Sequence, residues 1–282
     1  MGADLGCHVS AGNLPEIAGY RQAICQFASI PSLPMSAIDD FTQTAAWYGR
    51  AGANAMAETL WPTRCAICDA PGDALCEECR ARLPYIDWWR ACPRCGAPFG
   101  RVQCCECNDL MLSELGLEAL PFDGLVSAVS FTDESAAIVR TWKDAGERRL
   151  AAIMAGLMAP QIPPAWLKTR PTVTYVPATF AARQRRGFDH GHDLANDLAK
   201  LAGLRCADLL ARPRTADQRN LGRAGRARNL HGAFRNVPNI ACPPHVLLVD
   251  DVCTTGATIS AATLALKAAG ARTVHCATFA RV

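Results

Sequence analysis

The residues best suited to chemistry lie near the C-terminus, where carboxylates, hydroxyl groups and a glycine follow an apolar run. Val246–Val249 is followed by Asp250 and Asp251, and then by Val252-Cys253-Thr254-Thr255-Gly256-Ala257-Thr258. Four apolar residues in a row are typical of a strand in the middle of a parallel sheet, which we expect to end at the two aspartates. Residues 258–269 are predicted to form the helix that follows. A strand, a short loop and a helix N-terminus together present backbone N–H groups to an anion.

The loop has the groups that a phosphorylated sugar requires. Thr254, Thr255 and Thr258 supply hydroxyl donors, and Gly256 allows the backbone to approach a ligand closely. Two neighbouring carboxylates repel a phosphate that carries nothing else. The pattern therefore favours a ligand with a phosphate at one end and hydroxyl groups or bound Mg²⁺ at the other, such as a phosphorylated ribose. The chain has no Walker or dinucleotide-binding glycine pattern that competes for this role.

A second group of reactive residues consists of eight cysteines in four Cys-x-x-Cys pairs. The pairs are Cys65 and Cys68, Cys76 and Cys79, Cys92 and Cys95, and Cys104 and Cys107. Each pair can place two thiolates on one face of Zn²⁺, so the eight thiolates suffice for two structural zinc sites. The intervals favour pairing of consecutive pairs, and interleaved pairing is the alternative. A segment this short buries too little surface to fold alone, so we expect zinc to stabilise it.

Arginines form a third group. Residues 183–235 contain twelve Lys and Arg against five Asp, a local charge of +7 in a chain of net charge +3. Arg183, Arg185 and Arg186 follow a predicted strand at residues 172–176, in a segment expected to be a turn, and guanidinium groups at such a place suit a diphosphate. The alternative is a solvated basic turn. Residues 212–235 lack a helical or strand period up to Ala233-Phe234, and a loop with this much charge is expected to be either functional or disordered.

Composition limits the class of protein. Half of the 282 residues are hydrophobic, and no apolar run is long enough for a membrane span. The first residues lack a basic segment followed by a long apolar one, so no secretory signal is expected among them. We therefore expect a cytoplasmic protein without membrane insertion. A content of 15 cysteines in such a protein favours metal binding over a disulfide framework. The predicted domains are a variable, disordered extension at residues 1–55, a double zinc ribbon at 56–110 and a ligand-binding domain at 120–282. His190 and His192 are expected to be surface or helix-capping residues.

From about residue 60 to the end, these motifs resemble the ComF family, which includes ComFC-like and GntX-like proteins. The run from Asp250 to Thr258 resembles the 5-phosphoribosyl-1-pyrophosphate (PRPP) motif of type I phosphoribosyltransferases. The resemblance implies an α/β fold: a type I phosphoribosyltransferase fold, with a twisted parallel sheet flanked by helices, preceded by a small cysteine-rich double zinc ribbon. The chain departs from the family pattern at Asp189-His190, where Asn-Gln is common, and at the extra Cys105.

The resemblance also implies roles for individual residues. Residues 250–258 would bind PRPP, with Asp250 and Asp251 on the ribose hydroxyls or on Mg²⁺. Pyrophosphate would lie against Arg183, Arg185 and Arg186, and the catalytic residues would be Asp250, Asp251 and Arg186. The flexible loop over the site would include Gln218, Arg223, Arg226 and Asn229. The expected metals are two structural Zn²⁺ and one Mg²⁺ that accompanies PRPP.

Two functions follow from the resemblance, because the family is linked to natural competence and to the handling of single-stranded DNA. The first is a PRPP-binding phosphoribosyltransferase acting in DNA uptake or nucleotide-linked metabolism, with an acceptor that the sequence does not identify. The alternative is a non-catalytic protein that binds PRPP and single-stranded DNA during transformation, since such domains also serve as ligand sensors. Competence proteins are expected partners of either. Trp88, Trp89 and Phe99 either stack on bases or pack around the zinc-ordered core.

Overall fold

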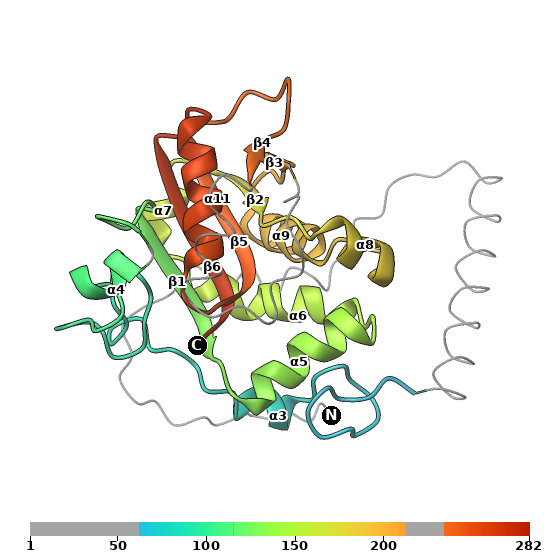
Figure 1. The fold of residues 1–282 in the computed structure, drawn as a ribbon. Coiled ribbons are helices and arrows are strands. Elements are labelled where there is room, and N and C mark those ends of the chain that lie inside the picture. The colour runs from blue at the N-terminus through green and yellow to red at the C-terminus, as the bar shows by residue number, and fades with distance from the viewer. Residues whose placement is uncertain (1–61, 115, 212–233) are drawn as a thin grey trace, which may run out of the picture. The chain divides into compact units, whose positions relative to one another are not determined.

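The structure is a computed structural model that describes residues 62–114, 116–211 and 234–282 (Figure 1). The extension predicted at residues 1–55 therefore lies outside the described residues. The helices and strands follow one another in this order: α3 (Glu77–Ala81), α4 (Asp109–Glu114), β1 (Gly124–Ser130), α5 (Asp133–Asp144), α6 (Arg149–Met158), η2 (Ala159–Gln161), α7 (Pro164–Leu167), β2 (Thr172–Tyr175), α8 (Phe180–Arg186), α9 (His190–Ala202), β3 (Leu210–Ala211), β4 (Arg235–Asn236), β5 (His245–Cys253), α11 (Ala257–Ala268) and β6 (Thr273–Arg281).

A four-stranded parallel sheet in the order β1-β6-β5-β2 forms the centre of the fold. Leu247 and Val249 of β5 belong to one buried cluster with residues of α6 and α9, and Val246 and Leu248 belong to another with residues of α11. Helices thus cover both faces (Figure 1), which explains why β5 has an uninterrupted apolar run. The predicted α/β class, a parallel sheet flanked by helices and preceded by a cysteine-rich segment, is confirmed.

The strand β5 extends further than the sequence predicts. Its pairing with β2 stops at Tyr175 and Val249, but its pairing with β6 continues to Cys253 and Arg281. The expectation that the strand ends at the two aspartates is therefore wrong, because β6 is long enough to hold β5 for four more residues. Asp250 and Asp251 lie inside the strand, at the carboxyl end of the sheet and beyond the point where β2 ends.

A glycine divides the helical region that follows β1 into α5 and α6. Helix α5 begins after Thr132, whose backbone N–H donates to Ser135 Oγ at 2.8 Å. Gly146, with φ of +76°, follows α5 and separates it from α6. Trp142 and Met154, one from each helix, are completely buried in the same cluster. The packing of α5 against α6 fixes the C-terminal end of α5, which reaches the carboxyl end of the sheet.

The cysteine-rich segment is attached to the edge strand β1. Ile86 N–H donates to Ala128 O at 3.0 Å, and Ser130 N–H donates to Pro84 O at 2.8 Å, so residues 84–86 extend the sheet by antiparallel pairing. Further along, Leu125 N–H donates to Arg94 O at 3.2 Å. The ribbon region and the sheet therefore share backbone hydrogen bonds. Within the described parts of the chain, no helix has the length and apolar character needed to cross a bilayer.

Candidate functional site

The two aspartates at the end of β5 meet a cation from α5. Lys143 Nζ lies 2.5 Å from Asp251 Oδ2, and the two side chains are 20% and 7% exposed. Asp250 Oδ1 accepts a hydrogen bond from the Asp251 N–H at 3.0 Å. Burial of one carboxylate is thus balanced by an ammonium group, while the other remains partly accessible.

These surroundings separate the pKa values of the two carboxyl groups. Burial acts to raise the pKa of Asp251, but the ammonium group of Lys143, with His190 and the hydrogen bonds, outweighs it and lowers the pKa to about 2. Burial and the negative charge of Asp251 raise the pKa of Asp250 well above its usual value. Asp251 is therefore the ionised member, and Asp250 is the member whose ionisation a bound cation would promote.

Immediately after β5, the chain turns into the helix α11. Gly256 adopts a left-handed conformation with φ of +76° and precedes the first helical residue without providing a side-chain cap. Ala257 N–H donates to Thr255 Oγ1 at 3.3 Å, which leaves the hydroxyl hydrogen of Thr255 available for a ligand. The first N–H groups of a twelve-residue helix thus lie beside the aspartates, as anion binding at a helix N-terminus requires.

The three arginines predicted at a turn lie on the short helix α8. Thr179 Oγ1 accepts a hydrogen bond from Ala182 N–H at 3.2 Å and begins the helix, and Gly187, with φ of +78°, ends it. These capping residues explain why the segment is helical. Arg183 and Arg185 are exposed, whereas the Arg186 side chain is only 8% exposed.

Arg186 connects α8 to α5 and α9. One terminal nitrogen lies 3.2 Å from His190 Nδ1, and the other donates to Asp144 Oδ1 at 3.4 Å. Since Asp144 follows Lys143, the end of α5 contacts both the acidic pair and the arginine helix. Burial, together with the charges of Lys143 and Arg186, lowers the pKa of His190 to about 3, so the imidazole is neutral near pH 7.

The sequence predictions missed three of these residues. Lys143 and Asp144 were given no role, because a charged pair at the end of an amphipathic helix is ordinarily a solvated one. The only signal was their place at a helix C-terminus after the first strand of the domain. His190, expected at the surface or as a cap, is buried with its ring 5.4 Å from Trp142, while His192 is exposed as expected.

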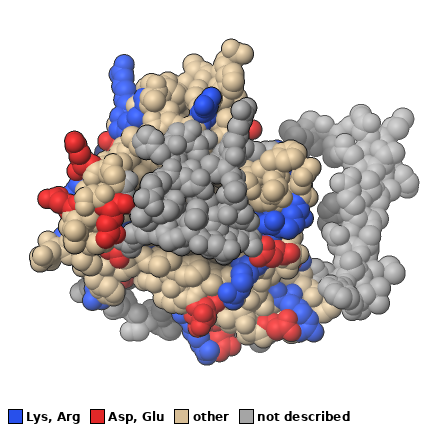
Figure 2. All heavy atoms as spheres, in the orientation of Figure 1, with Lys and Arg blue, Asp and Glu red and all other residues tan. Residues whose placement is uncertain are grey.

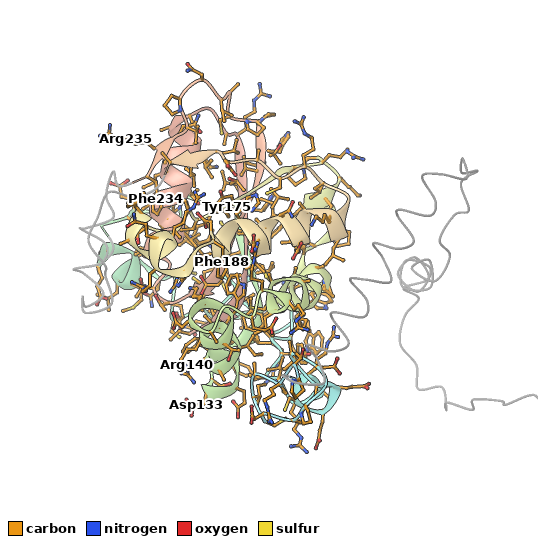
Figure 3. All side chains as sticks on the ribbon, turned by 90° about the vertical axis from the view of Figure 1, so that its right-hand side faces the viewer. Asp133, Arg140, Tyr175, Phe188, Phe234 and Arg235 are labelled. Atoms are coloured by element: carbon orange, nitrogen blue, oxygen red, sulfur yellow. The ribbon has the colours of Figure 1, made fainter. Side chains whose placement is uncertain are left out.

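Aromatic side chains hold the neighbouring elements in place. The Phe188 ring lies 5.2 Å from the Arg148 guanidinium, and Arg148 pairs with Asp193 of α9 at 2.7 Å. Tyr175, at the end of β2, donates its hydroxyl to Asp208 Oδ1 at 2.9 Å. Figure 3 labels Phe188 and Tyr175 among the side chains of this region. The turn between α8 and α9 is therefore fixed against the start of α6.

The predicted flexible loop falls outside the described residues. Gln218, Arg223, Arg226 and Asn229 all lie within residues 212–233, so their predicted role stays a prediction. Where described residues are visible in Figure 2, both basic and acidic side chains occur, and the two kinds are mixed in its lower right part. Six of the twelve basic residues of the basic region belong to residues 212–233.

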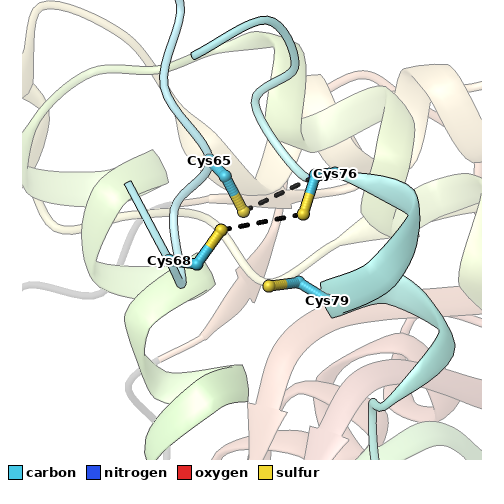
Figure 4. Close-up of side chains that lie close together, drawn as sticks. All are labelled: Cys65, Cys68, Cys76 and Cys79. Atoms are coloured by element: carbon cyan, nitrogen blue, oxygen red, sulfur yellow. Dashed lines mark hydrogen bonds between the residues drawn. The ribbon is translucent and has the colours of Figure 1, made fainter. Parts of the chain in front are cut away.

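The first cysteine tetrad consists of Cys65, Cys68, Cys76 and Cys79, whose sulfur atoms all lie within 4.8 Å of one another. Figure 4 shows the four side chains pointing toward a common centre. Cys68 Sγ and Cys76 Sγ are 3.7 Å apart. Sulfur atoms around a tetrahedral Zn²⁺ with Zn–S bonds of about 2.3 Å are about 3.8 Å apart, so the tetrad fits the ion.

The second tetrad consists of Cys92, Cys95, Cys104 and Cys107, and the same limit of 4.8 Å holds. Its sulfur–sulfur distances include 3.8 Å between Cys92 and Cys107 and 3.5 Å between Cys95 and Cys104. Each tetrad thus combines consecutive Cys-x-x-Cys pairs. Cys105 is exposed and does not belong to the second tetrad.

Three aromatic residues around the second tetrad are accessible. Trp88, Trp89 and Phe99 are 65%, 55% and 71% exposed. The Arg90 guanidinium lies 4.5 Å from the centre of the Phe99 ring. Of the two predicted roles for these residues, packing around the zinc-ordered core does not agree with such exposure, and stacking on a ligand stays a prediction.

Comparison with known proteins agrees with this architecture. Residues 56–109 match the double zinc ribbon domain, and residues 224–282 match the phosphoribosyl transferase domain. The DNA utilization protein YhgH of Salmonella typhi is 31% identical over 225 residues, which cover 71% of this chain and 94% of that protein. The protein of the same name from Escherichia coli O6:H1 is 27% identical over 195 residues, which cover 65% and 81%.

Proposed function

The chain belongs to the ComF family, which joins a double zinc ribbon to a phosphoribosyltransferase domain, and we propose that it binds PRPP with Mg²⁺ and acts in DNA utilization. One observation carries the proposal. At the carboxyl end of β5, Asp250 and Asp251 adjoin the N-terminus of α11, and Lys143 closes the same edge from α5. Ligands of open α/β sheets bind at such an edge.

The geometry supports a division of the ligand between the strand and the helix. The backbone N–H groups and hydroxyls of residues 254–258 suit the 5-phosphate. Asp250 and Asp251 suit the two ribose hydroxyls, which donate to carboxylates. Because Lys143 already neutralises Asp251, the pair offers Mg²⁺ limited negative charge. The residues therefore fit an Mg²⁺ that takes most of its ligands from the phosphates of PRPP and from water.

Arg186 is suited to the pyrophosphate group. Its Nε is buried and, among the described residues, has no hydrogen-bond partner, although both terminal nitrogens have contacts. An unpaired donor of this kind is costly unless a ligand accepts from it. Arg183 and Arg185 on the same helix are exposed and can add charge where a pyrophosphate would lie.

Transfer from PRPP breaks the bond between C1 and the pyrophosphate oxygen. The leaving group takes the bonding electron pair, and the acceptor supplies a new pair to C1 and loses a proton. Lys143 and Arg186 would stabilise the charge that gathers on pyrophosphate, and the neutral His190 would exclude water beside them. Residues 212–233 are proposed to cover the ligand.

The role in DNA utilization is proposed from the relatives, which carry that name. Single-stranded DNA is the proposed partner, either as the acceptor or as a bound strand. The exposed Trp88, Trp89 and Phe99 support it, because bases stack on accessible aromatic rings. The comparisons do not favour the non-catalytic alternative.

Two measurements test the proposal. Calorimetric titration should give PRPP binding that requires Mg²⁺ and is lost without it. Release of pyrophosphate should then be followed with and without acceptors, including single-stranded DNA. Absence of Mg²⁺-dependent binding would contradict the site, and binding without release in any mixture would favour a ligand sensor over an enzyme.

A further inference from the structure

The last residue of β6, Arg281, is a buried cation that the site described above does not use. Its side chain is 5% exposed. In the parallel pairing of β5 with β6, Arg281 stands opposite Cys253, the residue from which the chain leaves the strand for the ligand loop. The register of these two strands therefore places the Arg281 guanidinium group next to the start of residues 254–258.

On the side of residues 254–258, the Arg281 guanidinium group contacts one main-chain atom and one side-chain atom. One terminal nitrogen, Nη1, donates to Thr254 O at 3.1 Å and also contacts Cys253 Sγ. The next residue reinforces this, since Val282 N–H donates to Cys253 O at 3.0 Å. The end of β6 thus determines where the loop begins.

Toward the ribbon, Arg281 contacts a residue between two metal ligands. Its other terminal nitrogen, Nη2, donates to Glu106 Oε2 at 3.2 Å. The backbone N–H of Glu106 in turn donates to Cys104 Sγ at 3.4 Å. Such N–H contacts to ligand sulfurs are part of the outer environment of a zinc site. Glu106 therefore makes two contacts: its main-chain N–H donates to a metal ligand, and its side chain accepts from Arg281.

We propose that Arg281 is a positioning residue that couples metal occupancy of the second tetrad to ligand binding by residues 254–258. The inference rests on the proposed function, because it requires that this loop binds PRPP. Zinc orders residues 104–107 and so places the Glu106 carboxylate. The guanidinium is planar and rigid, and it binds Glu106 through one terminal nitrogen and the Thr254 carbonyl through the other. A fixed Glu106 carboxylate therefore also fixes the Thr254 carbonyl.

Loss of zinc has a defined consequence in this arrangement. Residues 104–107 lose their tether, and Arg281 is left as a buried cation without its carboxylate partner. A buried charge that loses its partner is strongly unfavourable, so the guanidinium and the loop that it holds must rearrange. Coupling between two sites is reciprocal, so a ligand on residues 254–258 also strengthens zinc binding by the second tetrad.

The test uses the full zinc-loaded chain and hydrogen–deuterium exchange resolved by peptide, together with the rate of zinc release to a chelator. Mg²⁺ and PRPP should lower exchange at residues 250–258 and also at residues 95–107, with no change at residues 65–79. The affinity of the second tetrad for zinc should rise about fivefold or more, the usual lower range of such coupling, and zinc release should slow with it.

Three variants separate coupling from stability. Glu106→Gln is the milder change, because the Glu106 side chain is 35% exposed, and Arg281→Lys keeps the charge without the fork. In Glu106→Gln and in Arg281→Lys, PRPP at higher concentration should still protect residues 250–258 from exchange. It should no longer protect residues 95–107. Lys267→Gln removes a different ion pair, with Asp123, and should behave as the unmodified chain.

Three results would overturn the inference. If ligand protects residues 250–258 of the unmodified chain but not residues 95–107, the coupling is wrong and the PRPP site stands. If PRPP still protects residues 95–107 in both Glu106→Gln and Arg281→Lys, the coupling does not pass through Arg281. Absence of protection at residues 250–258 at saturating PRPP overturns the proposed function as well.

Discussion

The ion pair between Lys143 and Asp251 joins α5 to the end of β5 at the centre of the proposed site. Replacing Asp251 by Asn leaves the ammonium group without its counter-charge. We expect the free energy of unfolding to fall by about 2–3 kcal/mol, less than for a fully buried pair because Lys143 keeps some exposure. Mg²⁺-dependent PRPP binding should weaken. Urea denaturation and calorimetric titration measure the two effects.

The matched control is Lys143→Met, measured alone and together with Asp251→Asn. If the pair acts as a unit, the double variant should be more stable than the sum of the single changes predicts. Single-stranded DNA binding should be unchanged or tighter in Asp251→Asn, because a negative charge is removed. Unaltered PRPP affinity in Asp251→Asn would contradict the assignment of this carboxylate to the ligand.

Asp250 predicts a pH dependence of ligand binding. Its pKa in the folded protein is raised by burial and by Asp251, so the carboxyl group holds its proton above its usual range. Ionisation of Asp250 therefore lowers the stability of the ligand-free protein as pH rises through the raised pKa. Mg²⁺ with PRPP favours the ionised form, so affinity should increase as pH rises through this raised pKa.

The comparison with Asp250→Asn isolates this carboxyl group from the titration of PRPP itself. PRPP titrates in the same way in both experiments. A difference between the two proteins in the slope of PRPP affinity against pH therefore reports the protonation of Asp250. Identical slopes would show that Asp250 does not change its protonation when the ligand binds.

At the scale of elements, the two tetrads predict two zinc ions per chain. Metal analysis under reducing conditions should give about two, and Cys92→Ser, in the second tetrad, should give about one. A chelator should destabilise the ribbon region, because its fold depends on the metal. Fewer than one zinc per chain in the unmodified protein would contradict both sites.

The contact between strand β1 and the segment that holds the second tetrad, called the second ribbon below, depends on a glycine. Gly96 has φ of +69°, and a Cβ there would lie 2.6 Å from Leu125 O. Gly116 has nearly the same φ, +68°, with nothing within 4 Å of its Cβ position. Gly96→Ala should therefore cost about 2 kcal/mol or more in stability, and Gly116→Ala about 1 kcal/mol.

Thermal unfolding of the two variants gives the comparison. Since both residues share the left-handed conformation, the difference between them measures the close approach of the ribbon to the sheet. Equal losses would mean that β1 and the second ribbon move apart at little cost.

At the scale of the whole molecule, charge is concentrated in one part of the sequence. Residues 212–233 contain six arginines, and Arg223, Arg226 and Arg228 can be replaced together by Ala. DNA binding should weaken, and its salt dependence should become shallower by up to about one unit of slope for each lost phosphate contact. Titration of single-stranded DNA at several salt concentrations measures this slope.

The control for this prediction is the exposed pair Arg183 and Arg185, changed to Ala on α8. That variant should affect PRPP binding more than DNA binding. Normal DNA binding by the triple variant would assign the DNA contact to the ribbon, with its exposed Trp88 and Trp89, and would leave residues 212–233 as a cover for the ligand.

The sequence alone determined the parts of this protein that depend on short spacing. Two thiolates three residues apart can share one zinc whatever the rest of the chain does, so the cysteine pairs were predictable. The apolar run, the two aspartates and the glycine-containing loop were predictable for the same reason, because strand, loop and helix follow one another within about 25 residues.

Tertiary structure decided which distant residues meet at these parts. Lys143 and Asp251 are 108 residues apart, and Arg281 and Glu106 are 175 apart. Their contacts depend on the register of β5 with β6, on the greater length of these strands compared with β2, and on the packing of α5 against the sheet. No local pattern encodes these relations, since each arises only when segments far apart in the chain bury their apolar faces together. The same packing buried His190 and divided the three arginines of α8 into one enclosed and two exposed side chains.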